Sequence, residues 1–509
     1  MVLEKLEPRI VWSIFEDIFT KSPRPSNREE KVRQKIKDWV LEHKKQGLEV
    51  VQDSAGNLLV RKQATKGKGT WPALLFQGHM DMVCETSRPG GFDFQNSAIP
   101  VRIDPDGEWV SADSTTLGAD DGIGVSLALA LLIDDDPAFV HGPIEVLITF
   151  AEETGLDGAE NLDQGILGIK SKHMINVDSE EFATVTIGSA GGGAMHVNTA
   201  FTYEQESRKS GLSYHELFVS GLRGGHSGVD IHLPRANAIK LTARVLSSVV
   251  EKIPIFLHAW DGGTRTNAIP RDAKVQFAVN AKDARILADA VRMETANLEQ
   301  YYKGRAASGE IMEPELKITL NTVESVACMS SQKSEEIVRL ATALPHGPDK
   351  FSPVLPSLVE TSNNVAVIKT DPATRKFDIL LYPRSNVDAE LEAFRRRLAS
   401  IGRLAGWTIE LDDAYPAWPP DPSSSLLKFV KQKYEATINK PVNIMAVHAG
   451  LECSVIGKKI PALSKNIVSL GPLVENAHSP AERIRIKDVH ILYQALKSML
   501  SSASELILK

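Results

Sequence analysis

The sequence predicts an α/β fold in which a mainly parallel sheet is covered by helices. Three short apolar runs, at 73–76, 144–150 and 174–177, each end in polar side chains near a turn. Between the first two lies the run 122–134, whose length and Ala and Leu content favour a buried helix. Strands that alternate with helices are typical of parallel sheets with both faces covered. Ligands bind beyond the carboxyl ends of such strands, which is where the polar side chains occur here.

The first elements expected along the chain are a helix and a hairpin. The charged amphipathic pattern of residues 31–48 predicts the helix. Residues 49–53 and 57–61 flank a small-residue turn at 54–56, which is typical of a β-hairpin. Both elements are interpreted as scaffold.

After Ile187 the pattern changes to alternating segments beside two amphipathic helices. One helix is predicted over about 235–252, and the other over 388–405, where acidic residues precede basic ones in the order that suits the helix dipole. Antiparallel strands beside helices favour a separate α+β domain. The alternating segments are 194–201, 216–220, 274–280, 317–322 and 376–382.

A proline-rich stretch, 415–422, then predicts a linker. The strand and helix pattern of the first part resumes beyond it. We therefore expect one α/β domain made of residues 1–187 and 417–509, interrupted by an insertion over 188–416. The resumed elements are strands at 442–447 and 466–470 and helices that begin near 451 and 487.

Composition and charge exclude several classes of protein. The chain has 509 residues, 42% of them hydrophobic and 24% charged, which indicates a folded protein with more than one structural unit. Its formal net charge of −7 provides no basic field for nucleic acid or anionic lipid. The longest apolar run, 125–133, is far shorter than the roughly 18 residues that a membrane span needs. Charges near the N-terminus argue against an export signal, so we expect a cytoplasmic protein.

The cysteines restrict the kind of metal site that the chain can form. Cys84, Cys328 and Cys453 are widely spaced and odd in number. Such a set predicts neither a disulfide framework nor a thiolate zinc site, and we interpret Cys84 and Cys453 as buried, unreactive thiols. A metal in this chain would be held by oxygen and imidazole.

Five polar clusters occur at predicted loop positions, and each alone has a plain structural alternative. His79 can donate to a carboxylate in a turn, and Asp120 can cap the helix that follows it. Adjacent acidic residues at 152–153 would repel unless a cation or proton relieved them. Together the clusters supply a carboxylate-rich set with two imidazoles, which suits a pair of divalent cations. The clusters are His79 with Asp81, Asp120 with Asp121, Glu152 with Glu153, Asp178, and His478.

Five motifs follow one another along the chain: Gly-His-Met-Asp at 78–81, Gly-Ala-Asp-Asp-Gly at 118–122, Ala-Glu-Glu-Thr-Gly at 151–155, Gly-Gly-His-Ser-Gly at 224–228 and Asn-Ala-His at 476–478. In this order they resemble the motifs of the M20 metallopeptidases, in their aminoacyl-histidine dipeptidase branch. The resemblance runs from about Ile18 to the C-terminal helix. It implies a di-metal aminopeptidase-like catalytic domain with an inserted lid.

The resemblance implies a ligand set for two divalent metals, with zinc expected and manganese or cobalt as alternatives. One metal takes His79, Asp120 and Asp178. The other takes Asp120, Glu153 and His478, so that Asp120 bridges both.

Two further residues of the first domain receive roles from the same resemblance. Glu152 is the expected general base, and Asp81 is expected to orient the ring of His79. The peptide between Asp120 and Asp121 is expected to be cis. The chain departs from the family at Asp121, where Asn is common, and at Ser454, where Gly is common, which puts fine substrate preference in doubt.

The insertion would be a lid and dimerisation domain that helps to hold the substrate. His226 is expected to stabilise the oxyanion, with a simple turn histidine as the alternative. Asn267 and Arg384 are expected to grip the substrate carboxylate, with a surface ion pair as the alternative for Arg384. Glu452 would face the free α-amine or cap its own helix. The resemblance also suggests a homodimer formed through the lid.

These expectations together predict a cytosolic metallo-dipeptidase. Its substrates would be Xaa-His dipeptides such as β-alanyl-histidine, or dipeptides of broad specificity. An M20-type deacylase or aminoacylase is the alternative within the same chemistry. A non-catalytic metal-binding protein on this fold is the alternative from another class.

Overall fold

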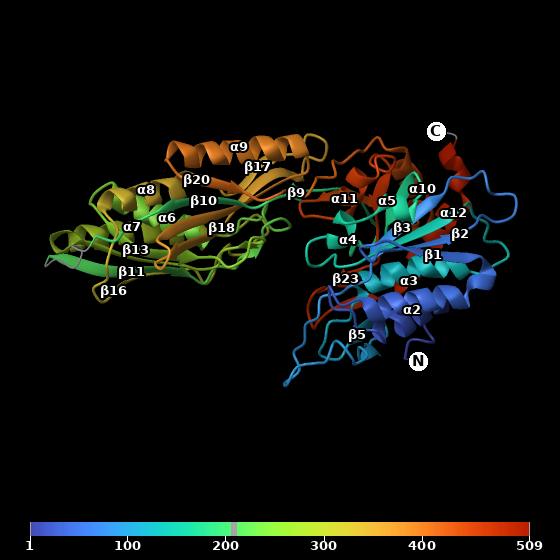
Figure 1. Ribbon diagram of the computed structural model, residues 1–509. Coiled ribbons are helices and arrows are strands. Elements are labelled where there is room, and N and C mark those ends of the chain that lie inside the picture. The colour runs from blue at the N-terminus through green and yellow to red at the C-terminus, as the bar shows by residue number, and fades with distance from the viewer. Residues whose placement is uncertain (1, 205–210, 508–509) are drawn as a thin grey trace. The chain divides into compact units, whose positions relative to one another are not determined.

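The computed structural model describes residues 2–204 and 211–507, which form two compact units (Figure 1). The first unit consists of Met1–Ser189, Trp418–Ala446 and Leu451–Lys509. The second consists of Ala190–Ala417 and the short segment Val447–Gly450. The predicted division placed that short segment in the first domain. Residues 205–210, inside the predicted insertion, lie outside the described residues.

An eight-stranded sheet forms the centre of the first unit, in the order β1-β2-β6-β3-β7-β22-β8-β21. The four strands β6, β3, β7 and β22 are parallel, and β3 and β6 are buried along their whole length. The outer pairings β1–β2, β2–β6 and β22–β8 are antiparallel, so the expectation of a mainly parallel sheet is correct only for the centre. The strands are β1 (Leu48–Gln52), β2 (Leu58–Lys62), β3 (Leu74–His79), β6 (Ile144–Thr149), β7 (His173–Asn176), β8 (Thr184–Ser189), β21 (Asn443–Val447) and β22 (Ile467–Ser469).

Helices lie on both sides of this sheet, with α3 on one side and α4 and α11 on the other (Figure 1). The helix α3 packs against β3 and is buried on nearly all sides, as its Ala and Leu content predicted. On the same side α12 contacts both α3 and α10. The helices are α1 (Arg9–Ile14), α2 (Glu30–Glu42), α3 (Ala119–Ile133), α4 (Asp157–Glu160), α5 (Gln164–Leu167), α10 (Ser425–Ile438), α11 (Glu452–Lys459) and α12 (Ile486–Ser501).

The predicted helix over 31–48 is too long at its C-terminal end. The helix α2 ends at Glu42, and a short 3₁₀ turn over Lys44–Gln46 follows it. Gly47 then adopts a φ of 82°, a left-handed conformation that ends helical structure and leads directly into β1. The hairpin that follows is confirmed, with Val50 opposite Val60.

A small four-stranded sheet, not predicted from the sequence, joins two distant segments of the first unit. Its order is β23-β24-β5-β4, and β24 pairs antiparallel with β5. It therefore brings the residues before α3 beside the residues that follow His478. The strands are β4 (Val101–Ile103), β5 (Trp109–Ala112), β23 (Val474–Glu475) and β24 (Arg483–Arg485).

A ten-stranded antiparallel sheet with one layer of helices forms the second unit. The main path is β16-β11-β15-β13-β18-β19-β10-β20, with β17 paired to β18 and β9 to β19. The helices contact one another in the order α7, α6, α8, α9, and bury a core against the sheet. All five alternating segments predicted from the sequence lie in strands here. The strands are β9 (Gly191–Gly192), β10 (Met195–Ala200), β11 (Leu212–Ser220), β13 (Phe256–Gly262), β15 (Ala273–Asn280), β16 (Lys317–Thr322), β17 (Gly347–Phe351), β18 (Val359–Asp371), β19 (Lys376–Ser385) and β20 (Thr408–Leu411), and the helices are α6 (Ala238–Val250), α7 (Ala284–Tyr302), α8 (Ser331–Ala343) and α9 (Asp388–Leu404).

The proline-rich stretch near 415–422 is not a free linker. Tyr415 exchanges backbone hydrogen bonds with Gly192, and Trp418 does so with Ser189. Backbone hydrogen bonds at Tyr415 and at Trp418 therefore hold this connecting segment in place. Among the described residues, no helix is long and apolar enough to cross a bilayer.

Candidate functional site

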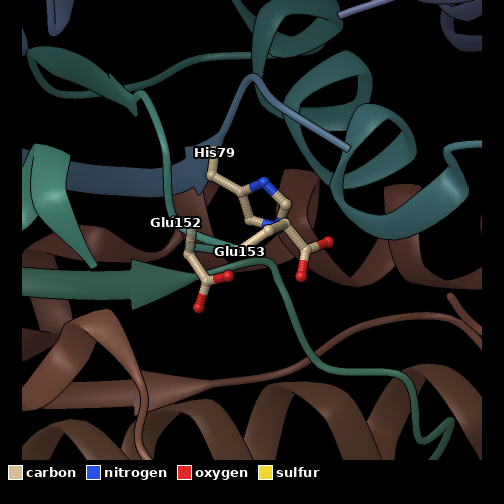
Figure 2. Close-up of side chains that lie close together, drawn as sticks. All are labelled: His79, Glu152 and Glu153. Carbon is tan, nitrogen blue, oxygen red and sulfur yellow. The ribbon is translucent and has the colours of Figure 1, made fainter. Parts of the chain in front are cut away.

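The acidic and imidazole side chains predicted as ligands come together at one edge of the central sheet. His79 ends β3, Glu152 and Glu153 follow β6, and Asp178 follows β7. Because these three strands are parallel and adjacent, their carboxyl ends meet at the same edge. Figure 2 shows His79, Glu152 and Glu153 clustered there.

Asp120 occupies the centre of this cluster, between two imidazoles. Its Oδ1 lies 3.0 Å from His79 Nε2, and its Oδ2 lies 2.9 Å from His478 Nε2. Asp178 Oδ1 lies 3.4 Å from His79 Nε2, and Glu153 Oε2 lies 3.0 Å from His478 Nε2. Two groups of three potential ligands thus share Asp120: His79, Asp120 and Asp178, and Asp120, Glu153 and His478.

The donors of this cluster fit divalent cations. Oxygen and imidazole nitrogen are the only kinds of donor in these groups, and both suit zinc, manganese or cobalt. Glu153 Oε1 is buried and has no hydrogen-bond partner among the described residues, as expected of an atom that awaits a cation. Cys84 belongs to neither group, and burial raises the pKa of its thiol to about 12.

Electrostatics at the cluster also favour a cation. Burial raises the pKa of Asp178 to about 6, and neighbouring carboxylates add to this effect. Hydrogen bonds to Asp120 and Glu153 raise the pKa of His478 to about 11. Burial lowers the pKa of His79, but Asp178 and the other carboxylates around it more than offset this, and the pKa lies well above its usual value. The crowded carboxylates therefore favour positive charge next to them. Protonated imidazoles provide that charge here, and divalent cations would provide more of it.

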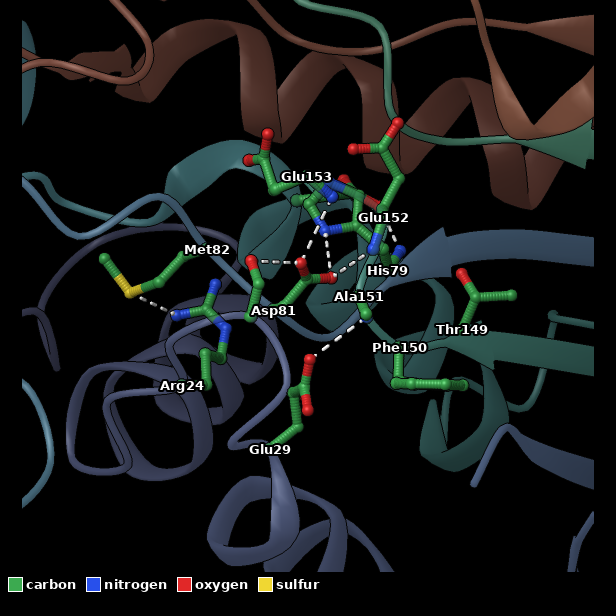
Figure 3. Close-up of polar contacts among 12 residues, drawn as sticks. Arg24, Glu29, His79, Asp81, Met82, Thr149, Phe150, Ala151, Glu152 and Glu153 are labelled. Carbon is green, nitrogen blue, oxygen red and sulfur yellow. Dashed lines mark hydrogen bonds and ion pairs between the residues drawn. The ribbon is translucent and has the colours of Figure 1, made fainter. Parts of the chain in front are cut away.

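Asp81 contacts both His79 and the loop after β6 that carries Glu152 and Glu153 (Figure 3). Its Oδ1 lies 3.2 Å from His79 Nδ1 and accepts from the backbone N of Glu152 at 3.0 Å. Its Oδ2 accepts from the backbone N of Glu153 and from Ser26 Oγ. One carboxylate thus lies next to the imidazole ring and accepts from the peptide groups of both glutamates.

Glu152 lies beside His79 and forms a third group of potential ligands with His79 and Glu153, but it is in neither of the two groups that share Asp120. Burial raises its pKa well above the usual value, and the nearby carboxylates of Asp178, Glu153 and Glu452 raise it further. A carboxylate with a raised pKa accepts a proton more readily near neutral pH. These properties suit the general base expected from the sequence, a role that stays a prediction.

The expected cis peptide between Asp120 and Asp121 is confirmed. The Asp121 carboxylate is buried, and its Oδ2 accepts from the backbone N of His79 at 3.3 Å. A Cβ at Gly78 or Gly124 would come within 2.0 Å of that carboxylate, so these glycines make its space. Ser454 Oγ donates to the carbonyl of Leu451 at 2.8 Å. Both side chains therefore bond the protein's own backbone, and their effect on substrate preference stays a prediction.

Glu452 is buried in the first turn of α11 and does not cap it. Its Oε2 accepts from Gln77 Nε2 at 2.6 Å and from Thr149 Oγ1 at 2.7 Å, while Oε1 has no partner among the described residues. The N-cap residue is Leu451, so the alternative of a helix cap is wrong. Burial raises the pKa of Glu452 to about 7. Its carboxylate thus accepts hydrogen bonds from one side chain of β3 and one of β6.

His226, in the second unit, is held as a neutral ring with a defined tautomer. Its Nδ1 accepts from the backbone N of Gly228 at 3.2 Å and of Val229 at 3.0 Å. Burial lowers its pKa to about 4, and Arg384 adds to this effect. The ring proton therefore belongs on Nε2, which is left to donate to another group. His226 lies on the two-residue strand β12 (Gly225–His226), which pairs with β14 (Ala268–Ile269).

Arg384 is a buried cation of the second unit, so the alternative of a surface ion pair is wrong. It is 4% exposed, and no carboxylate of the described residues lies within ion-pair distance of it. Its Nη1 donates to Tyr415 Oη at 2.6 Å, and its guanidinium carbon lies 4.7 Å from the centre of the Tyr382 ring. Its Nε is buried without a partner among the described residues. Such a guanidinium retains donors for an anionic ligand.

Asn267 is exposed in the same unit, next to β14. Its backbone carbonyl accepts from the N of Ser227, the residue after His226, at 2.7 Å. The structure thus brings together His79, Asp81, Asp120, Glu152, Glu153, Asp178 and His478 in the first unit, and places His226, Asn267 and Arg384 in the second.

Two residues that support these groups were missed by reasoning from the sequence. Tyr415 was assigned to the linker, and Glu482 follows the last predicted ligand in an ordinary Ser-Pro-Ala-Glu run. Their partners, Arg384 for Tyr415 and residues 117–120 for Glu482, are distant in sequence. No spacing pattern connects such positions.

Comparison with known proteins gives consistent matches over nearly the whole chain. Residues 75–502 match peptidase family M20/M25/M40. The cytosol non-specific dipeptidase of Escherichia coli (strain K12) is 36% identical over 499 residues, which cover 98% of each chain. The crystal structure of aminoacylhistidine dipeptidase from Vibrio alginolyticus is similar, with a TM-score of 0.85, 34% identity and coverage of 98% of this chain and 97% of that one. The aminopeptidase PepT from Bacillus cereus ATCC 10987, at 15% identity and a TM-score of 0.55 over 98% of this chain and 99% of that one, shares the fold.

Proposed function

This chain belongs to peptidase family M20/M25/M40, and from that membership we propose that it is a metal-dependent dipeptidase. The observation that carries the proposal is the position of Asp120 between two imidazoles, each with a further carboxylate beside it. The similarity to a non-specific dipeptidase and to an aminoacylhistidine dipeptidase supports dipeptides as the substrate class, with Xaa-His among them. The name of the first relative also supports a place in the cytosol.

We propose that two divalent cations occupy the site, with zinc as the metal and manganese or cobalt as alternatives. His79, Asp120 and Asp178 would hold one, and Asp120, Glu153 and His478 the other. When bound, such cations act as Lewis acids toward a carbonyl oxygen and a water molecule.

The protein's own groups would move the protons. Glu152 accepts a proton from the attacking water and passes it to the leaving amine, and its raised pKa supports both steps. Asp81 keeps the His79 ring and the peptide of Glu152 in place during this exchange. His226 Nε2 donates to the carbonyl oxygen as negative charge develops there.

The substrate's ends would be recognised by separate groups. Arg384, with Nη1 on Tyr415 and other donors free, would bind the C-terminal carboxylate together with Asn267. Glu452 would attract the free α-amine through its negative charge, since its carboxylate already accepts hydrogen bonds from Gln77 and Thr149. A homodimer formed through the second unit belongs to the same proposal.

The test is hydrolysis of β-alanyl-histidine and a panel of free dipeptides with added Zn²⁺, Mn²⁺ or Co²⁺. Turnover of free dipeptides, but not of their N-acetylated forms, is the expected result. Preference for N-acylated substrates would support the deacylase alternative instead. Stoichiometric metal with no turnover of any amide would support a non-catalytic protein.

The His226→Ala variant is expected to lower kcat about 10²- to 10³-fold, with a small change in KM, because the lost hydrogen bond forms fully only in the transition state. Steady-state kinetics on one dipeptide measure this effect. His232→Ala, which removes an exposed imidazole of the same segment, is the control and should leave kcat unchanged. An unaltered kcat in His226→Ala would contradict the role.

The Arg384→Lys variant is expected to raise KM for dipeptides roughly 10-fold or more, since a lysine cannot form the paired hydrogen bonds of a guanidinium. Dipeptide amides lack the carboxylate, so their KM should not change. Arg375→Lys, an exposed arginine of the same unit, is the matched control. Equal effects on dipeptides and their amides would show that Arg384 does not bind the carboxylate.

A further inference from the structure

We propose that Glu482 is a positioning residue that fixes the loop carrying Asp120 and thereby sets the affinity of the site for divalent cations. The inference rests on the proposed function and adds to it a residue outside the ligand set. Glu482 lies between His478 and the strand β24, and its side chain is buried. Its carboxylate makes four hydrogen bonds to one loop.

The carboxylate of Glu482 accepts hydrogen bonds from four successive backbone N–H groups. Oε2 accepts from Leu117 at 2.7 Å and from Gly118 at 2.9 Å. Oε1 accepts from Ala119 at 2.7 Å and from Asp120 at 3.3 Å. Successive N–H groups that converge in this way form a site for an anion, and here the protein supplies that anion itself. The last of the four donors is the backbone of Asp120.

Arg24 holds the same loop from its carbonyl side. This wholly buried arginine donates from Nη2 to the carbonyl oxygen of Gly118 at 2.7 Å. A Cβ at Gly118 would lie 2.8 Å from Arg24 Nη1, and a Cβ at Gly122 would lie 2.5 Å from Nη2. The loop is therefore fixed through both its N–H groups and a carbonyl, between one buried anion and one buried cation. A larger residue at either glycine would displace the guanidinium of Arg24.

Glu482 also links two of the candidate ligands to each other. It follows His478 by four residues, and His478 Nε2 lies 2.9 Å from Asp120 Oδ2. The residues after Glu482 pair with β5, the strand that precedes the loop, with Arg483 opposite Ser111. One segment thus presents an imidazole to the Asp120 side chain and a carboxylate to the Asp120 backbone. A shift of this segment would change the distance between the two ligands.

A glutamine at this position would keep the shape of the side chain and lose the match of donors to acceptors. Its amide NH₂ would face two backbone N–H groups, and a buried donor that lacks an acceptor is costly. The loop would then move to find other partners. Asp120 would move with it, because its own N–H is one of the four donors.

The test compares metal binding by Glu482→Gln with that by the full-length wild type. Groups that orient ligands typically cost about 10- to 100-fold in metal affinity when changed, and a rise in Kd of that size is expected. Affinity is measured by competition with a chromogenic chelator, and the visible spectrum of the Co²⁺-loaded protein reports the ligand geometry. Circular dichroism establishes that the variant is folded.

Glu145→Gln is the matched control. Glu145 is a buried carboxylate of the same unit that accepts from the backbone N of Lys170 at 3.0 Å and of Ser171 at 2.9 Å. It lies at the start of β6, whereas the ligands follow the strand ends. Its replacement should lower thermal stability and leave Kd and the Co²⁺ spectrum unchanged.

The outcomes separate this inference from the proposed function. Wild-type affinity and spectrum in Glu482→Gln would overturn the role of Glu482, while the wild type would still bind metal. A wild type that binds no divalent metal would overturn the proposed function itself. If Glu482→Gln does not fold, Glu482→Asp keeps the charge but is one methylene too short to reach all four N–H groups. That variant is expected to bind metal more weakly than the wild type, and an unchanged Kd would overturn the proposal.

Discussion

Replacement of Glu152 by glutamine is expected to lower kcat on dipeptides at least about 10²- to 10⁴-fold while leaving the metal content unchanged. Glutamine has nearly the same volume but cannot accept a proton from water. Glu152 is outside the two groups that share Asp120, and the third group that contains it uses His79 and Glu153, which already belong to those two, so metal is expected to stay bound without Glu152. Kinetics and elemental analysis on the same preparation measure both quantities.

The neighbouring residue provides the matched control. Glu153→Gln makes the same substitution at the next residue. It alters a carboxylate whose Oε2 lies 3.0 Å from His478 Nε2. It should lose activity and metal together. Equal loss of metal in Glu152→Gln would show that the general base has been assigned to the wrong glutamate.

Replacement of Asp120 by alanine is expected to reduce bound metal to less than one ion per chain and to make hydrolysis undetectable. Both candidate groups contain this carboxylate, so one substitution removes a donor from each. Two imidazoles and two carboxylates would remain as donors, but the ligand that the two groups share would be lost. Metal analysis after dialysis, followed by an activity assay with added Zn²⁺, measures the effect.

Asp113→Ala is the control for Asp120→Ala. Asp113 precedes the same loop, is largely exposed and pairs with Arg88 at 3.1 Å. Its loss should leave metal content and turnover unchanged, since an exposed pair is worth little. Full metal content and turnover in Asp120→Ala would contradict the shared-ligand arrangement.

The parts of the fold that the sequence predicted are those in which local pattern and burial agree. The run at 122–134 became α3 because its small and apolar residues suit a helix buried on nearly all sides. The polar residues after β3, β6 and β7 were predicted to meet because parallel strands end at one edge. The helix over 31–48 was predicted too long because its charged pattern continues through Lys44 and Lys45, beyond Glu42, where α2 ends.

The parts that the sequence did not predict depend on partners that are distant along the chain. The outer strands of the central sheet are antiparallel, and nothing in their composition distinguishes them from the parallel centre. Tyr415 looked like part of a linker because prolines surround it, yet its hydroxyl accepts from Arg384. Glu482 had no local sign of its role, since the four N–H groups that it binds come from residues 117–120. Such contacts form only when the chain folds.

The second unit cannot be cut out of this protein as one continuous piece. Besides Ala190–Ala417 it contains Val447–Gly450, so the polypeptide passes between the units four times. Within that short segment His448 Nε2 lies 2.7 Å from Ser362 Oγ, and His448 Nδ1 lies 3.1 Å from Asn386 Oδ1. A recombinant fragment that ends at Ala417 would lack this histidine and leave both polar partners buried and unsatisfied. Fragment complementation or circular permutation should therefore keep residues 447–450 on the same polypeptide as Ala190–Ala417.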